Sequence, residues 1–194
     1  EGAWSWSINR DVGSVLPANN DATMPTTDPD ASQWALSEAY LLQALPANLL
    51  AAAGKMAFAA WGDLNMFANR ENSQFLYTGL NVNPIAGAFF PYTALIGWLA
   101  WSPSKAHTLT PIYSQGESSA TVTGFDTLFN GNDTYAFQYV FTTEIAKRPG
   151  RYEVDAAYST KDVPSFDISD RLLIGEILGV VPVDEKSDNY AVVA

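Results

Sequence analysis

The chain has 194 residues, enough for one domain or for a run of about eight to ten membrane strands of usual length. It is 47% hydrophobic but only 16% charged, so it either buries much apolar surface or exposes that surface to lipid. The net charge of -11, without a basic cluster, argues against nucleic-acid binding. The absence of cysteine excludes disulfides and thiolate metal sites, and no apolar run reaches the about 20 residues of a membrane-spanning helix.

The first third of the chain contains one clear strand signal and one predicted hairpin. Residues 3–9 alternate apolar and polar positions, which places two tryptophans on one face of a strand. Residues 16–32 are rich in Pro, Asn and Asp and predict a long exposed loop. Residues 33–45 and 49–60 are apolar and are separated by a short Pro-containing turn, which predicts a hairpin, although the first of these segments also has helix propensity.

The rest of the chain continues with a long loop and further strands. Residues 61–91 are polar and aromatic with many Gly, Asn and Pro, and predict a long structured loop. Strand signals follow at 93–101 and 107–114, and weakly at 118–125. Residues 134–147 and 151–160 predict the best strand pair, joined by residues 148–150. An acidic segment follows with a short helix expected near 169–177, and residues 189–194 predict the start of another strand.

Alternation along the best pair separates rings from charges. One face of the first strand holds Tyr135, Phe137, Tyr139 and Phe141. In the second strand Arg151, Glu153 and Asp155 alternate with Tyr152, Val154, Ala156 and Tyr158. Aromatics outside and charges inside is the pattern of a barrel wall with a wet interior. We expect the rings, together with Trp98 and Trp101, to face lipid, although they would also suit the core of a soluble sandwich.

Several short motifs follow one another in a defined order and spacing between positions 33 and 194. They are Glu38, Ala39, Tyr40, Gly54, Lys55, Asp63, Phe67, Ala68, Asn69, Glu71, Gln74, Phe75, Leu76, Asn83, Pro84, Gly150, Arg151, Tyr152, Asn189, Tyr190 and Ala191. In the order and spacing of these residues, the chain resembles the carbohydrate-selective porin family of bacterial outer membranes, the OprB type. The resemblance implies an all-β fold, an antiparallel transmembrane β-barrel that has 16 strands in the family and a narrow eyelet formed by inward loops.

The family's chains are roughly twice as long, so residues 1–194 would form a single domain that covers about half of the barrel wall. Residues 61–91 would be its pore-constricting loop. Half a barrel leaves two open edges that lipid does not tolerate, and we therefore expect these residues to be part of a longer protein.

Two groups of candidate site residues follow. The loop contributes aromatic faces and planar polar groups of the kind that bind sugars: Trp61, Asp63, Asn65, Asn69, Arg70, Glu71 and Gln74. The charged residues of this loop could equally have a structural role and cap its turns. Lys55, Arg151, Glu153 and Asp155 are expected to line the pore, where mixed charges create a transverse field or simply keep the bore wet.

The function implied by the resemblance is passive diffusion of small hydrophilic solutes, with sugars as permeants, through an outer-membrane channel. It implies lipid surroundings, no cofactor, no metal, no nucleic acid and, by analogy, a homo-oligomer such as a trimer. Two alternatives stay open, a soluble or surface-attached β-rich carbohydrate-binding module and a structural outer-membrane protein without transport. An enzyme is disfavoured because the chain has one histidine and no Gly-x-Ser-x-Gly elbow, although paired carboxylates remain untested.

Overall fold

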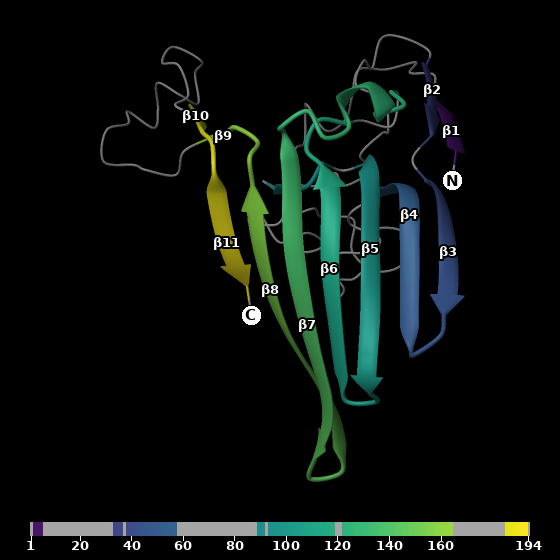
Figure 1. The fold of residues 1–194 in the computed structure, drawn as a ribbon, viewed down its shortest axis with the longest axis vertical. Coiled ribbons are helices and arrows are strands. Elements are labelled where there is room, and N and C mark those ends of the chain that lie inside the picture. Colours follow the sequence, from purple (N-terminus) through teal and green to yellow (C-terminus); the bar gives the residue numbers. More distant parts are fainter. Residues whose placement is uncertain are drawn as a thin grey trace.

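The computed structural model describes residues 2–5, 33–36, 38–57, 89–91, 93–118, 122–164 and 185–193. Their main feature is a seven-stranded antiparallel sheet with the order β11-β8-β7-β6-β5-β4-β3 (Figure 1). Its strands are β3 (Ala39–Leu45), β4 (Leu49–Ala57), β5 (Thr93–Ser104), β6 (His107–Gln115), β7 (Asp133–Ile145), β8 (Arg148–Ser159) and β11 (Asn189–Val193). Two small sheets pair β1 (Gly2–Ser5) with β2 (Gln33–Leu36), and β9 (Val163–Pro164) with β10 (Glu185–Lys186).

The connections of the main sheet are short at one end and long at the other. The turns β3–β4, β5–β6 and β7–β8 lie together at the lower end in Figure 1. The connections β4–β5, β6–β7 and β8–β11 leave the sheet at the opposite end and run through 58–92, 116–132 and 160–188. Short turns on one side and long loops on the other are typical of outer-membrane barrels.

The β7–β8 turn differs from the predicted one. It consists of Ala146 and Lys147, which have φ values of 51° and 62°, whereas residues 148–150 belong to β8. Pro149 pairs with Glu144, and Gly150 pairs with Thr143. A two-residue turn with both residues in the left-handed region has a twist that matches the flanking strands, so the hairpin closes before the Pro-Gly pair is reached.

The predicted strands are otherwise largely confirmed. The hairpin of β3 and β4 is present, and pairing with β4 from Ala39 to Leu45 makes β3 a strand despite its helix propensity. β5, β6 and β11 match the segments predicted at 93–101, 107–114 and 189–194. The weak strand at 118–125 is wrong in its described part, because 122–124 is irregular and Phe125–Thr127 forms the 3-10 turn η2. The loop 16–32, most of 61–91 and the helix near 169–177 lie outside the described residues.

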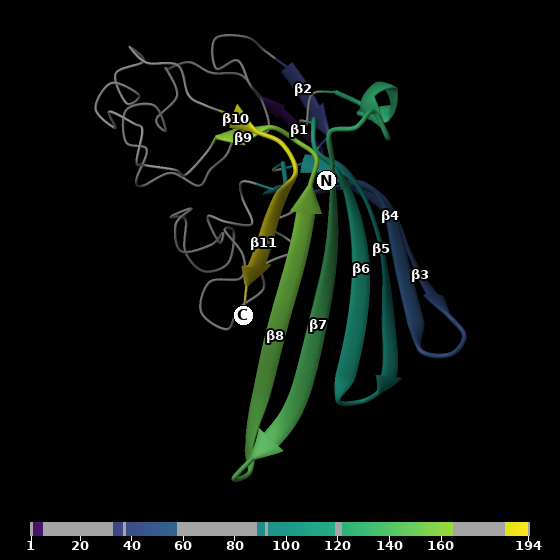
Figure 2. The same cartoon turned by 60° about the vertical axis from the view of Figure 1, so that its left-hand side comes forward.

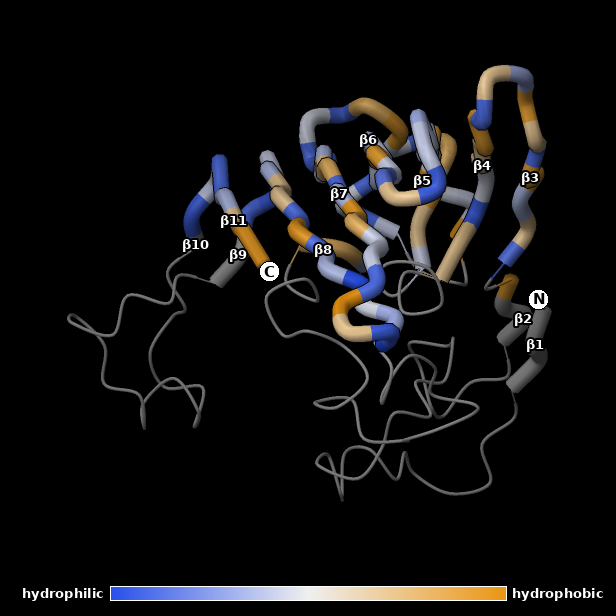
Figure 3. Tube along the Cα trace, turned by 90° about the horizontal axis from the view of Figure 1, so that it is seen from below, coloured by the Kyte–Doolittle hydropathy of each residue, from blue (hydrophilic) through white to orange (hydrophobic). Residues whose placement is uncertain are grey.

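The sheet is curved, and its two faces are built differently. Seen end-on, the seven strands follow an arc (Figure 3), and Figure 2 shows the same bend from the side. Side chains on the concave face form two apolar clusters. The first contains Ala52, Met56, Ala94 and Ile96; in the second, Phe89 and Phe90 pack against Ile112, Ala136, Ala157 and Ala191. In the described part of the chain no helix is long and apolar enough to cross a bilayer.

Candidate functional site

A cavity of about 350 Å³ opens on the concave face of the sheet. Side chains of β4, β5, β6, β7 and β8 converge on it, as a curved sheet allows only on its inner side. Its apolar lining consists of Leu50, Phe90, Ile96, Trp98, Ala100, Ile112 and Val140, and its polar lining of Thr108, Thr110, Gln138 and Arg151. The cavity therefore offers one broad aromatic ring, an apolar floor and a few planar or hydroxyl groups.

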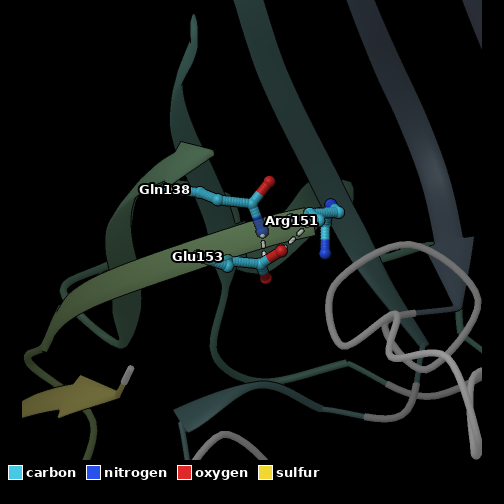
Figure 4. A network of polar contacts seen from close by, with 3 residues as sticks. All are labelled: Gln138, Arg151 and Glu153. Atoms are coloured by element: carbon cyan, nitrogen blue, oxygen red, sulfur yellow. Dashed lines mark hydrogen bonds and ion pairs between the residues drawn. The ribbon is translucent and has the colours of Figure 1, made fainter. Parts of the chain in front are cut away.

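A polar network lies at the edge of this cavity, on β7 and β8 (Figure 4). Gln138 Nε2 donates a hydrogen bond of 2.9 Å to Glu153 Oε1, and the Arg151 guanidinium forms an ion pair with the other carboxylate oxygen. The position opposite Gln138 on β8 is Asp155, which shares the concave face with Arg151 and Glu153. Opposite charges fixed side by side create a local field across the inner face.

The inner end of the long β4–β5 connection is anchored to the same face. The Thr134 hydroxyl donates to the Phe89 carbonyl oxygen at 2.7 Å and lies 2.9 Å from the Ser159 hydroxyl. Thr134 and Ser159 are fully buried, and Phe89 and Phe90 are nearly so. The last described residues before β5 are therefore held against the concave side of β6, β7 and β8.

The convex face carries two rows of rings at opposite ends. A tyrosine row crosses four adjacent strands in direct register through Tyr113, Tyr135, Tyr158 and Tyr190. Its ring centroids are 5.7 Å apart between Tyr113 and Tyr135 and 5.0 Å apart between Tyr158 and Tyr190. A second aromatic row, near the short turns, consists of His107, Phe141 and Tyr152, with centroids 5.1 and 6.3 Å apart.

The convex surface between the two rows is apolar. The positions that face outward there on β6, β7, β8 and β11 are Leu109, Pro111, Phe137, Tyr139, Val154, Ala156 and Val192. Phe137 is 44% exposed and Val192 is 72% exposed, so nothing in the described part of the chain covers this band. The rows are about 20 Å apart along β7, at about 3.3 Å per residue.

Two sequence predictions about side-chain direction need correction. Lys55 pairs with Leu95 on the convex face, opposite to the cavity, and its ammonium group donates to the Val122 carbonyl oxygen of the β6–β7 connection. It is buried there instead of lining the interior. Trp98 lies on the concave face and lines the cavity, whereas Trp101 is exposed on the convex face, since positions three apart in a strand point to opposite sides.

Trp61, Asp63, Asn65, Asn69, Arg70, Glu71 and Gln74 lie outside the described residues, and the pore-constricting role of 61–91 stays a prediction. Among the residues that the structure describes, no cluster of His, Asp or Glu could hold a metal ion. The structure brings together Arg151, Glu153 and Asp155, and it leaves Lys55 on the other face.

Sequence reasoning missed several cavity residues. Trp98, Thr108 and Thr110 line the cavity but were not singled out as site residues. The signal for Trp98 was its separation from Trp101 by an odd number of positions, which forbids a shared face in a strand. Phe90 joins the cavity through the approach of the β4–β5 connection to the sheet, and no periodicity in the sequence indicates that approach.

Comparison with known proteins supports the fold. No protein-family model and no curated protein sequence matches the chain. Among solved structures, OprB of Pseudomonas putida, in its high-pH structure, matches 86% of this chain with a TM-score of 0.54 and 16% identity. The chain spans 44% of that protein, less than half of its length. The all-β architecture and the resemblance to OprB expected from the sequence are therefore confirmed at the level of the fold, and the chain has the fold of part of an OprB-type barrel.

Proposed function

We propose that the chain forms part of the wall of an outer-membrane channel through which small hydrophilic solutes, carbohydrates above all, diffuse passively. The convex face would contact lipid, and the concave face would line the path. The short turns would face the periplasm and the long connections the exterior, the usual orientation of such barrels.

The observation that carries the proposal is the uncovered apolar band between the two aromatic rows. Its outward side chains are apolar or aromatic on β6, β7, β8 and β11; Phe137, Val154 and Val192 are exposed, and Leu109 and Tyr139 are half-buried. Soluble monomers rarely expose a contiguous apolar patch larger than a few hundred Å². Rings at both margins of an apolar band are the arrangement by which barrels sit in a bilayer. A soluble carbohydrate-binding module would have to place these rings in a core, and they are not in one.

The concave face supports carbohydrate as the solute class. Sugars present C–H faces that stack on aromatic rings and hydroxyl groups that pair with planar polar groups. Trp98 supplies such a ring, and Gln138 and Arg151 supply an amide and a guanidinium on the same cavity. The network of Gln138, Glu153 and Arg151 would hold these groups in fixed positions along the path.

The experiment that tests the proposal is planar-bilayer recording on the full-length protein. We expect discrete single-channel steps in potassium chloride and a concentration-dependent reduction of the current when a neutral disaccharide is added. Polyethylene glycol of similar size serves as the control for simple volume exclusion. A protein that inserts into the bilayer but never opens channels would be a structural outer-membrane protein, and the transport proposal would then fail. Channels that open but respond equally to sugar and glycol would limit the proposal to a general diffusion pore.

A further inference from the structure

The described part of the β6–β7 connection leaves large apolar side chains outside the protein. Phe125 is 71% exposed, Phe129 is 69% exposed and Val122 is 49% exposed. Phe125 begins the turn η2, and Phe129 lies just beyond it. Side chains of this size on an extramembranous loop would normally fold inward, because contact of their apolar surface with water is unfavourable. Their exposure therefore indicates that an apolar surface outside the protein covers them.

The connection is fixed to the convex face by specific contacts. The Lys55 ammonium group donates to the Val122 carbonyl oxygen, and Gln115 Nε2 donates to the Gly124 carbonyl oxygen at 2.8 Å. Gly124 has a φ of 82°, in the left-handed region, and a Cβ at this position would lie 2.6 Å from Gln115 Oε1, so glycine allows this close approach of the turn to the sheet without backbone strain. The two phenylalanines are thus presented outward by a turn that is held in place.

This turn lies beside the tyrosine row. The Phe129 ring is 4.8 Å from the Tyr113 ring, and the Phe129 amide donates to the Tyr113 hydroxyl oxygen at 3.3 Å. Tyr113 in turn begins the row that continues through Tyr135. In Figure 2 the segment that carries η2, drawn as a coiled ribbon, reaches sideways beyond the ends of β5 and β6. The exposed phenylalanines therefore continue the aromatic margin of the convex face outward.

We infer that Val122, Phe125 and Phe129 form a lipid-contact site of the β6–β7 connection, which rests on the surface of the bilayer and inserts its rings at the boundary between headgroups and acyl chains. The inference depends on the proposed function, since it assumes that the convex face lies in a membrane. Irregular backbone is not tolerated in the hydrocarbon region of a bilayer. The tyrosine row marks the headgroup depth and lies beside this turn, so the irregular backbone of the turn lies where polar surroundings tolerate it.

A lipid surface fits this patch better than a second copy of the chain. A stable protein interface buries about 800 Å² on each partner, whereas an aromatic side chain buries at most about 150–250 Å². Two phenylalanines and one valine are too few for such an interface. They are sufficient for an interfacial anchor, which adds to the area that the tyrosine row already contributes.

Site-directed spin labelling tests the site, and the 194 residues contain no cysteine that would interfere. Single variants Phe125→Cys and Phe129→Cys of the full-length protein are labelled and reconstituted in phosphatidylcholine vesicles. Collision with oxygen, which concentrates in lipid, is compared with collision with a water-soluble nickel chelate. Asp126→Cys, an exposed neighbour in the same turn, is the matched control, and Phe137→Cys reports the middle of the apolar band.

We expect the labels at positions 125 and 129 to collide with oxygen severalfold more, relative to the nickel chelate, than the label at 126, and less than the label at 137. If 125 and 129 behave like 126 while 137 is in lipid, the lipid-contact site is refuted and the channel proposal stands. If 137 also collides mainly with the nickel chelate, the membrane orientation itself is wrong. Spin–spin broadening between copies at 125 or 129, without oxygen access, would instead assign the patch to a second copy of the chain and overturn the inference.

Discussion

Tyr135 lies directly opposite Tyr158 on the neighbouring strand, and both occupy the same outward row as Tyr113 and Tyr190. Four tyrosines can lie in direct register across adjacent strands only if the number of residues between successive tyrosines leaves each of them on the same face of its strand. A shift of one residue in any strand would move its tyrosine to the concave face. Tyrosine combines an apolar ring with a polar hydroxyl, which suits a position where lipid meets water. The row therefore marks one margin of the apolar band.

A charge in the middle of this band should be costly. Phe137→Arg places a guanidinium between the two aromatic rows, and we expect it to lower the free energy of unfolding by about 2–4 kcal/mol in vesicles, the cost of an arginine at the bilayer midplane. The neighbouring variant Gln138→Arg, on the concave face, should cost clearly less. Urea unfolding in lipid vesicles measures both. Equal costs on the two faces would contradict the assignment of the convex face to lipid.

The pair of Arg151 and Glu153 should set ion selectivity. Glu153→Gln removes a negative charge and leaves Arg151 in place, so the channel should become more permeable to anions. Arg151→Gln should shift it toward cations. A unit charge in a water-filled bore acts on an ion that passes a few Å away with about 0.5–1 kcal/mol, so the permeability ratio should change about twofold to fivefold. Reversal potentials in a salt gradient give this ratio, and Tyr152→Phe on the opposite face should leave it unchanged. Shifts in the same direction for both charge variants would rule out this role.

Trp98 should contribute to sugar affinity as well as to the width of the path. Trp98→Ala removes the ring that lines the cavity, and the loss of about 0.5–1.5 kcal/mol of stacking predicts a decrease in sugar affinity of about twofold to tenfold. The conductance without sugar should rise because the bore widens. Trp98→Phe should retain most of the affinity. Current block by added sugar measures both quantities, and an unchanged block in the alanine variant would remove Trp98 from the path.

Thr134 should anchor the end of the β4–β5 connection. Thr134→Val keeps the shape of the side chain but removes the hydrogen bond to the Phe89 carbonyl oxygen, which then remains buried without this donor. We expect a loss of about 1–3 kcal/mol of stability and faster proteolysis before Phe89. The same substitution farther along the strand, Thr143→Val, is the control. Urea unfolding and limited proteolysis provide the measurements, and a neutral Thr134→Val would show that packing of Phe89 and Phe90 alone holds the segment.

Alternation in the sequence was sufficient to predict the strands and most of their faces. β7 and β8 carry their rings on one face and most of their charged groups on the other, so their pairing and the inward direction of Arg151, Glu153 and Asp155 could be predicted. β3 was ambiguous because its residues favour a helix locally, and only pairing with β4 decides its state. The β7–β8 turn was misplaced because Pro149 and Gly150 are strong turn residues, whereas the actual turn uses Ala146 and Lys147 in a conformation that their types do not favour.

In the apolar strands, the sequence does not indicate which face of the sheet each side chain occupies. β4 and β5 are hydrophobic on both faces, so the direction of Lys55 and Trp98 could not be inferred from a contrast between polar and apolar positions. The contact of Lys55 with Val122 joins residues far apart in the chain, and it depends on how the β6–β7 connection folds over the sheet. The cavity depends on the curvature of the sheet and on the position of Phe90, and no local sequence pattern indicates either of them.

The most direct test of the account is a cysteine scan of β7 from position 135 to 141 in the full-length protein, reconstituted in vesicles. A water-soluble, membrane-impermeant thiol reagent is added, and the modified fraction is measured by mass spectrometry. We expect modification from the aqueous bore at 138 and 140 and protection by lipid at 137 and 139, whereas position 136 should be protected by its packing against Phe89 and Phe90. Rapid modification of 137 and 139 from water, with protection at 138 and 140, would contradict it.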